Sequence, residues 1–182
     1  MRRAHAAGFS LVEVMVALII ISIGLLGIAK LQAVALSSTG TAGKRGLAAI
    51  EAASMASAMH TDRAYWSANT APTSTTLTGA VVSAATDAGL MAPVDCTVAG
   101  NRPCTTVRMA AYDLSTIATS LQTILPGYTG TIACNQTVAP PPVVCTITLT
   151  WIESAVASNS QGVQTGAAAA FQTPTYTLYV EP

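Results

Sequence analysis

The chain has 182 residues, and its eight basic and eight acidic side chains give a formal net charge of zero. Hydrophobic residues make up 51% of it and charged residues 9%, which favours one folded domain beyond an apolar anchor. Without a cluster of lysines and arginines on one face, the chain has no electrostatic footprint for nucleic acid, and we expect no nucleic-acid partner.

The first predicted element is an apolar segment close to the N-terminus. An uncharged run extends from Val14 to Ala29 and follows a short leader that contains Arg2 and Arg3. Counted from Phe9, the segment is about long enough to cross the roughly 30 Å hydrocarbon layer of a bilayer. Basic residues on the short N-terminal side favour a cytoplasmic location for that side, so we expect the rest of the chain to be exported.

Glu13 is the one carboxylate at the start of this apolar segment. An ionisable group at the centre of a membrane helix costs roughly 2.5–3.5 kcal/mol even on lenient scales, so Glu13 requires a partner. The segment itself offers none. Cleavage after Gly8 would create an α-amino group on Phe9, one helical turn before Glu13 and on the same face. We therefore predict that the Phe9 amine is the partner of Glu13.

The resemblance to a known family is carried by GFSLVEVMVALIIISIGLLG. This stretch resembles the class III signal of type IV prepilins and of the related pseudopilins of type II secretion. The later segments GLLGIAKLQ, YDLSTIATSLQTILPG and CTITLTWIE are similar to the minor pilin family called PilV. The resemblance implies that a prepilin peptidase cuts between Gly8 and Phe9 and that the new Phe9 amine is N-methylated. Glu13 would then neutralise the Phe9 amine of a neighbouring subunit.

The implied function is that of a minor pilin incorporated near the tip of a type IV pilus, where it helps to start assembly through protein–protein contacts. Its implied partners are the prepilin peptidase, the inner-membrane assembly platform, the major pilin, other minor pilins and a tip adhesin. Residues 1–8 would form the leader, 9–30 the membrane and fibre-core half of a long helix, and 31–182 the exported domain with the second half of that helix. The protein would begin as a single-pass inner-membrane protein with a periplasmic C-terminal domain.

Three alternatives remain open for the same segment. A minor pseudopilin of a type II secretion system would use the same signal and similar helix stacking. An ordinary secretory signal peptide would use Ala33-Val34-Ala35 as its cleavage site and release a secreted enzyme or binding protein. A plain single-pass anchor explains the length of the segment but neither Gly8-Phe9 nor Glu13.

The apolar segment is predicted to continue as one helix from Phe9 to about His60. Small and apolar residues recur there at helical spacing, and the predicted inward stripe consists of Leu47, Ile50, Ser54, Met55 and Met59. Such a helix would be roughly 75–80 Å long. Three glycines, at positions 40, 43 and 46, each lower helix stability by about 1 kcal/mol relative to alanine.

The next region is expected to be irregular. Thr, Ser, Asn, Gly and Pro punctuate Ser67 to Gly79, which predicts a loop. The stretch from Val81 to Met91 predicts a short helix with Leu90 and Met91 turned inward. Tyr65 and Trp66 are interpreted as packing residues at the end of the first helix.

The four cysteines agree with an oxidising compartment. Four cysteines allow three pairings, and the neighbour pairing, Cys96 with Cys104 and Cys134 with Cys145, is the most economical. It would close two short loops worth about 2.5–3 kcal/mol each. A metal site is the alternative, but the chain has no C-x-x-C, and beyond the leader only His60 accompanies the thiols.

A second helix is predicted from Tyr112 to Leu125, with Asp113 near its N-terminus, where a carboxylate suits the helix dipole. Pro126-Gly127 would end it. Strands are predicted at Thr131–Cys134, Val143–Ile152 and Thr175–Val180. The first two form a hairpin joined by Asn135–Pro142, and a polar, alanine-rich loop at Glu153–Ala170 follows the second. In the longest strand the odd-numbered residues are apolar and are expected to face a core.

The predicted fold class is α+β and pilin-like: a long N-terminal helix, with a membrane half and an amphipathic half, packed on a small antiparallel sheet. We find no catalytic constellation or metal-ligand spacing, and we expect neither enzymatic activity nor a cofactor. His60 is interpreted as structural or solvated. Four scattered carboxylates are expected to be solvated or to cap local structure: Asp87, Asp95, Asp113 and Glu153.

Overall fold

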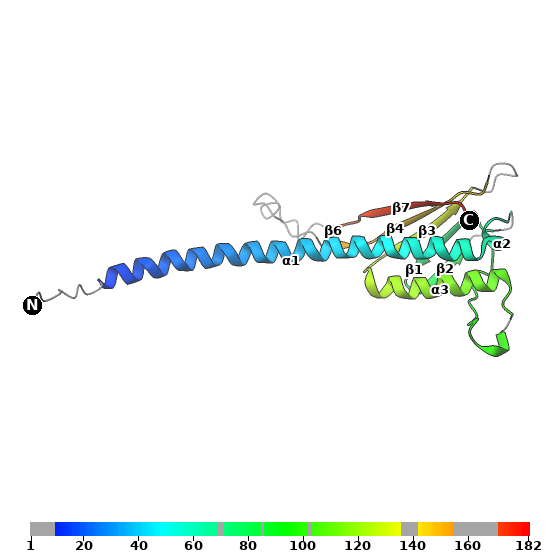
Figure 1. Ribbon diagram of the computed structural model, residues 1–182, viewed down its shortest axis with the longest axis horizontal. Coiled ribbons are helices and arrows are strands. Elements are labelled where there is room, and N and C mark those ends of the chain that lie inside the picture. Colours follow the sequence, from blue (N-terminus) through cyan, green and yellow to red (C-terminus); the bar gives the residue numbers. More distant parts are fainter. Residues whose placement is uncertain (1–9, 69–70, 85, 102, 136–141, 155–170) are drawn as a thin grey trace, which may run out of the picture. The chain divides into compact units, whose positions relative to one another are not determined.

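The computed structural model describes residues 10–68, 71–84, 86–101, 103–135, 142–154 and 171–182 (Figure 1). The chain divides into two compact units, Met1–Gly40 and Thr41–Pro182. Helix α1, Leu11–Thr61, begins in the first unit and ends in the second. It runs without interruption through Gly40, Gly43 and Gly46, because a helix tolerates single glycines at a modest cost in stability.

The part of α1 in the second unit supplies one layer of the core. Its buried residues are Ala48, Ala52, Met55 and Met59, which recur one turn apart and are 0% exposed. Three members of the predicted stripe are wrong, because Leu47 is 41% and Ile50 is 64% exposed and Ser54 is exposed as well. Two small and two large side chains of α1 therefore face the core, and the predicted Leu47 and Ile50 lie on its outer face.

A short helix, α2 at Arg63–Trp66, follows α1. Tyr65 and Trp66 are buried there, with their ring centroids 5.1 Å apart in an edge-to-face arrangement. Such a pair contributes about 0.5–1.5 kcal/mol beyond the area that it buries. The two aromatic residues therefore pack at the end of the long helix, as the sequence predicted.

The region after α2 contains a hairpin that the sequence analysis missed. Strand β1, Ser74–Thr78, lies in the segment that we predicted to be a loop, and β2, Val81–Ala84, lies where we predicted a helix. Both predictions are wrong. The turn between the strands contains Gly79 at φ 58°, a conformation that glycine adopts readily.

Helix α3, Thr106–Ile124, supplies another part of the core. It begins well before the predicted start at Tyr112, so Asp113 lies in its interior and not near its N-terminus, which corrects that prediction. Its buried apolar residues recur at helical spacing and include Leu114, Ile117 and Leu121. The helix ends before Pro126 as predicted. Gly127 follows at φ 60°, and a Cβ there would lie 2.6 Å from Cδ1 of Ile152.

The main sheet has five antiparallel strands in the order β2-β1-β3-β4-β7. The last three are β3 at Thr129–Cys134, β4 at Cys145–Thr150 and β7 at Thr175–Val180. In β4 the odd-numbered side chains are buried, as the alternation of residues predicted. Two further short strands, β5 at Glu153–Ser154 and β6 at Phe171–Gln172, pair with each other. A short 3₁₀ helix, η1, covers Ala99–Asn101.

One core joins these elements. The buried residues of α1 and α3 belong to the same apolar cluster as Leu77 of β1, Ile132 of β3 and Ile147 of β4. Helix α3 packs on β1 and β2. The predicted α+β arrangement, with a long N-terminal helix and a small antiparallel sheet, is confirmed.

Candidate functional site

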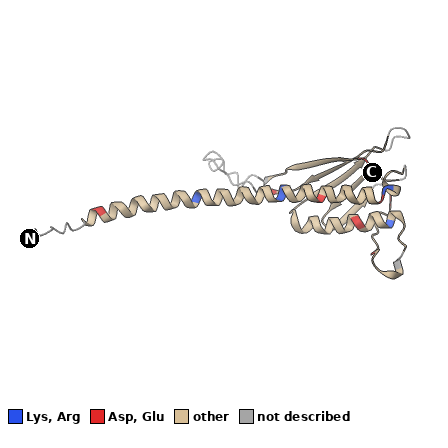
Figure 2. Ribbon diagram, viewed as in Figure 1, with Lys and Arg blue, Asp and Glu red and all other residues tan. Residues whose placement is uncertain are grey.

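The first half of α1 is exposed along its whole length. Every residue from 10 to 36 is exposed, and the large apolar side chains there include Leu11, Leu31 and Leu36, each more than 70% exposed. By length and composition α1 is able to cross a membrane. Figure 2 shows that the ribbon of α1 carries one acidic position near its start and then a long uncharged stretch. That acidic position is Glu13, and the next charged residue is Lys30.

Glu13 lies in the first turn of α1. Its backbone N–H donates to the carbonyl oxygen of Ser10 at 3.0 Å, and the N–H of Val14 donates to the same oxygen at 3.3 Å. A carboxylate in the first turn is favoured by the positive end of the helix dipole. The helix dipole therefore partly stabilises the negative charge of Glu13. The side chain is exposed and remains accessible to a cationic partner.

The predicted cleavage site lies outside the described residues. Gly8 and Phe9 precede Ser10, where the described part of the chain begins. The predicted pairing of a Phe9 amine with Glu13, and N-methylation of that amine, therefore stay predictions.

An ion pair joins Arg45 of α1 to Glu153 of β5, and it was not predicted from the sequence. The carboxylate of Glu153 is 4% exposed and accepts hydrogen bonds from Arg45 Nη2 at 3.1 Å and from Trp151 Nε1 at 2.9 Å. The expectation that Glu153 is solvated or caps local structure is wrong. A signal was present, because Glu153 continues the odd-numbered series whose members, including Trp151, face the core.

Two carboxyl groups lie near each other where α1 ends against α3. Asp62 is 7% exposed, and its Oδ2 has no hydrogen-bond partner among the described residues. Burial, with the nearby carboxyl of Asp113, raises the pKa of Asp62 to about 6, although a hydrogen bond from the backbone of Ala110 acts in the opposite direction. Burial also raises the pKa of Asp113, which is therefore not the solvated group that we expected. His60, by contrast, is exposed, which agrees with the interpretation that it is solvated.

Two other carboxylates organise loops. Asp95 accepts hydrogen bonds from the backbone N–H of Thr97 at 2.8 Å and from its hydroxyl at 2.6 Å, and these bonds lower the pKa of Asp95. Asp87 accepts from the backbone N–H of Gly89 at 2.8 Å and from the Tyr65 hydroxyl at 2.7 Å. Burial, together with the bond to Asp87, raises the pKa of Tyr65. Asp95 therefore has the local capping role that we expected, while Asp87 also holds a buried tyrosine.

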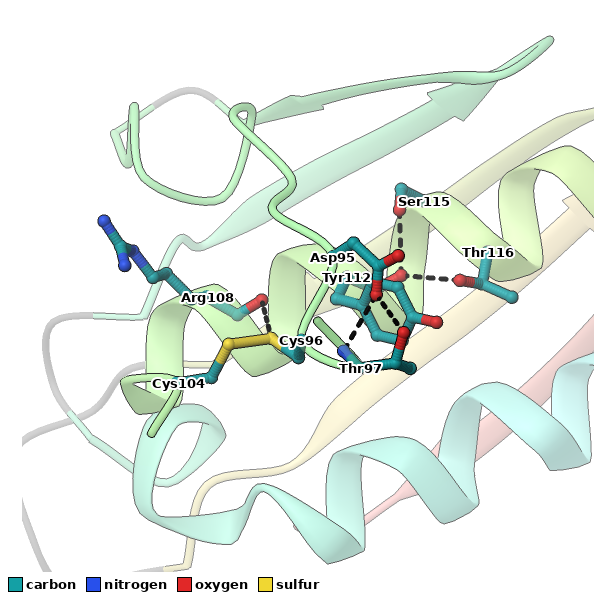
Figure 3. Close-up of a disulfide and its surroundings, with 8 residues drawn as sticks. All are labelled: Asp95, Cys96, Thr97, Cys104, Arg108, Tyr112, Ser115 and Thr116. Carbon is teal, nitrogen blue, oxygen red and sulfur yellow. Dashed lines mark hydrogen bonds between the residues drawn. A yellow bond between two sulfur atoms is a disulfide. The ribbon is translucent and has the colours of Figure 1, made fainter. Parts of the chain in front are cut away.

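The cysteines form two disulfides in the neighbour pairing. Cys96 and Cys104 close a loop before α3, and Cys96 Sγ lies 3.8 Å from the carbonyl oxygen of Arg108 (Figure 3). Cys134 and Cys145 lie opposite each other on β3 and β4, with their Cα atoms 4.0 Å apart. The described residues contain no free cysteine and no group of three His, Cys, Asp or Glu side chains that could hold a metal ion.

Two hollows lie on the second unit. One, of about 520 Å³, adjoins the first disulfide and is lined by Cys96, Pro103, Cys104 and Met109. The other, of about 310 Å³, lies between α1 and α3. Its described lining includes five residues with a hydroxyl group and one with a carboxyl group, and the residues are Ser54, Ser57, Ala58, Thr61, Tyr112, Asp113, Thr116 and Ile117.

Comparison with known proteins bears on the N-terminal segment. Residues 3–29 match the family model described as the prokaryotic N-terminal methylation motif. No curated protein and no solved structure matches the chain. The motif supports a type IV pilin-like protein that a prepilin peptidase processes. Together with the apolar helix α1, it fits anchoring in the inner membrane.

Proposed function

We propose that this protein is a minor pilin of the PilV type, processed by prepilin peptidase and incorporated near the tip of a type IV pilus. There it helps to start assembly through contacts with other minor pilins, the major pilin, the assembly platform and a tip adhesin. The observation that carries the proposal is the methylation motif at residues 3–29, which coincides with the start of a long helix whose apolar side chains are all exposed from Leu11 to Leu36.

The exposed apolar half of α1 supports a role in a membrane and then in a fibre. Soluble monomers rarely expose a contiguous apolar patch larger than a few hundred Å². A lipid bilayer, or the packed helices of other subunits, removes that surface from water. Glu13 is then the one ionisable side chain between Ser10 and Ala29, and the proposed Phe9 amine of a neighbouring subunit neutralises it.

The proposed role is contact and not catalysis. In the described part of the chain, the buried side chains of Glu153 and Tyr65 serve structural contacts, through the bond between Arg45 and Glu153 and that between Tyr65 and Asp87. The disulfides suit a domain that is exported to an oxidising compartment.

Mass spectrometry of the mature N-terminus tests the proposal. We expect the purified protein to begin at Phe9 and to carry a methyl group on its α-amine. A protein that begins at Leu36, or one that retains Met1, would contradict the proposal.

Deletion of the gene distinguishes a role in the pilus from a role in type II secretion. Loss of surface pili and of twitching supports the pilus, whereas loss of exported enzymes supports the minor pseudopilin.

A further inference from the structure

Strand β7 lies at one edge of the main sheet, and among the described strands it pairs only with β4. An edge strand presents unpaired N–H and C=O groups, which proteins commonly protect with charged residues, prolines or bulges. From Thr175 to Val180, β7 has no charged residue and no proline, and its register with β4 is unbroken over the full strand. Within β7 itself none of these protections is present, while Pro174 precedes the strand and Glu181 and Pro182 follow it.

The hydrogen bonds identify which backbone groups face the free edge. The N–H of Trp151 donates to the carbonyl oxygen of Pro174 at 3.4 Å, so these two residues form a hydrogen-bonded pair. Hydrogen-bonded and non-hydrogen-bonded pairs alternate along an antiparallel ladder. Tyr176, Leu178 and Val180 are therefore bonded to β4. The N–H and C=O groups of three other residues face outward: Thr175, Thr177 and Tyr179.

The other side of β4 gives the same alternation. The N–H of Asn135 donates to the carbonyl oxygen of Val144 at 3.0 Å, which directs the even-numbered residues of β4 towards β3. The odd-numbered residues of β4 are then directed towards β7, in agreement with the pairing of Ile147 and Leu178. Two independent bonds thus assign the same outward groups to β7.

The side chains of the sheet indicate which residue types a sixth strand, paired with β7, would need to carry. On the outer face, a continuous row of threonines crosses four strands and ends at β7, with members Thr76, Thr131, Thr148 and Thr177. On the core face, Tyr176 and Leu178 are only half-buried. An added strand that alternates threonine with an apolar residue would extend the row and cover these two side chains, since Thr–Thr and aromatic–β-branched cross-strand pairs are favourable.

A second copy of this chain does not fit the edge. Antiparallel pairing of two β7 strands needs a twofold axis perpendicular to the sheet, which would reverse the direction of α1 over the second sheet. The subunits of the proposed fibre stack with their helices in one direction, so a copy in the reversed direction does not fit, an argument that rests on the proposed function. Parallel pairing in register would place Glu181 of one copy beside Glu181 of the other.

We propose that the edge of β7 binds an extended, uncharged segment of a partner protein, which alternates threonine or serine with apolar residues. The segment adds a sixth strand through the outward N–H and C=O groups of Thr175, Thr177 and Tyr179. Main-chain hydrogen bonds of this kind supply affinity, and the alternate side chains supply specificity.

Amide hydrogen exchange of the full-length protein in detergent micelles, followed by NMR, tests the geometry. In the free protein we expect fast exchange at Thr175, Thr177 and Tyr179 and slow exchange at the β4-bonded residues Leu178 and Val180. Slow exchange at the three outward amides would overturn the proposal, because another segment or another copy would already cover the edge.

A synthetic heptapeptide of alternating Thr and Val, with blocked ends, is the binding probe. At about ten times its dissociation constant it should slow exchange roughly tenfold at the three outward amides and leave Leu178 and Val180 unchanged. In antiparallel pairing the peptide's threonine amides face β7. N-methylation of those amides should therefore abolish the effect, while N-methylation of the valine amides should preserve it. Equal binding of both methylated peptides, or no slowing by the unmodified one, would overturn the proposal.

A matched pair of variants tests the same edge from the protein side. Thr177→Pro removes the central outward N–H without removing a bond to β4, because proline is tolerated on the open side of an edge strand. Thr177→Val keeps that N–H. Only the valine variant should bind the peptide, with slow exchange at Leu178 and Val180 as the check that β7 is still paired. Peptide binding by both variants would contradict the proposal. These measurements do not depend on how the N-terminus is processed, so this proposal and the proposed function can fail separately.

Discussion

Asp62 is a buried carboxyl group whose ionised form the fold disfavours. Its pKa rises from 3.8 to about 6, chiefly because of burial and then because of the Asp113 carboxyl. Between these two pH values the folded state binds more protons than the unfolded state, so the free energy of unfolding falls as pH rises. Above pH 6 the cost is fully present, and we expect it to be about 1–2 kcal/mol after solvent screening.

Replacing Asp62 with Asn should remove this cost. We expect the Asp62→Asn variant to be about 1–2 kcal/mol more stable than the parent protein at pH 7 and equally stable near pH 4. Urea unfolding at a series of pH values measures both. Asp95→Asn is the control, since Asp95 is exposed and its pKa is lowered and not raised. An Asp62→Asn variant that keeps the parent's slope of stability between pH 4 and pH 6 would contradict this assignment.

The pair formed by Arg45 and Glu153 is asymmetric, because the Arg45 side chain is 56% exposed and the Glu153 side chain is 4% exposed. We expect Arg45→Met to destabilise the protein by about 1–2 kcal/mol, since it leaves a buried carboxylate with fewer hydrogen-bond donors. Lys44→Met removes the same charge from the adjacent position and should change the stability by less than about 0.5 kcal/mol.

A double-mutant cycle with Glu153→Gln isolates the interaction. Glutamine keeps an acceptor for Trp151 Nε1, so the cycle reports mainly the contact with Arg45. Coupling of about 0.5 kcal/mol or more is expected from urea unfolding of the four proteins. Strict additivity would mean that the two side chains do not stabilise each other in solution.

At the scale of elements, the contact between α1 and the rest of the core depends on small side chains. Ala48 and Ala52 are 0% exposed, so no space remains for larger groups. We expect Ala52→Leu to destabilise the second unit by about 1–3 kcal/mol through overpacking. Ala53→Leu is the matched control, because Ala53 is exposed on the same turn of α1. Urea unfolding compares them, and equal stabilities would show that the helix can move away from the sheet at little cost.

The contact between α1 and the core also separates the features that the sequence predicted from one that it did not predict. Strong periodic signals gave the long helix, the alternation of β4 and the end of α3 at Pro126-Gly127, because these features depend on local pattern. The inward face of α1 was assigned incorrectly, since hydrophobicity alone favours Leu47 and Ile50 over Ala48 and Ala52. Ala48 and Ala52 are fully buried, and which face of the helix is covered is decided by tertiary packing.

The missed hairpin has a different cause. Strands β1 and β2 consist largely of threonine, serine, valine and alanine, so their polarity resembles that of a loop. A signal was nevertheless present. Gly79 and Ala80 separate two runs of β-branched residues, and a two-residue connection with glycine first is typical of a type II′ hairpin. Asp62 and Arg45 could not have been assigned from the sequence, because their partners come from distant elements.

For the whole molecule, α1 belongs to two environments. After Thr41 its inward side chains are buried in the core of the second unit, whereas from residue 10 to residue 36 every side chain is exposed to its surroundings. The first environment depends on the protein's own fold. The second must be supplied by lipid or by other subunits, and this division is why one helix can serve both anchoring and assembly.

The Glu13 carboxylate should have different roles in a lipid bilayer and in a fibre of subunits. In a bilayer a carboxyl group near the end of the helix can reach the interface or become protonated, so its removal should not weaken insertion. In a fibre its proposed role is to neutralise the Phe9 amine of a neighbour, and no other side chain between Ser10 and Ala29 can do so. Glu13→Ala should therefore leave export and membrane level unchanged but strongly reduce incorporation into pili.

Fractionation and immunoblotting of sheared pili measure incorporation, and the membrane fraction reports export in the same cells. Ser10→Ala is the matched control: it alters a polar side chain in the same helical turn but keeps the carbonyl oxygen that accepts from Glu13 and Val14. We expect this control to assemble like the parent protein. If Glu13→Ala also assembles normally, the carboxylate is not the group that selects the neighbouring amine, and helix packing alone must account for assembly. If Glu13→Ala is lost from the membrane as well, its role lies in insertion and precedes any fibre.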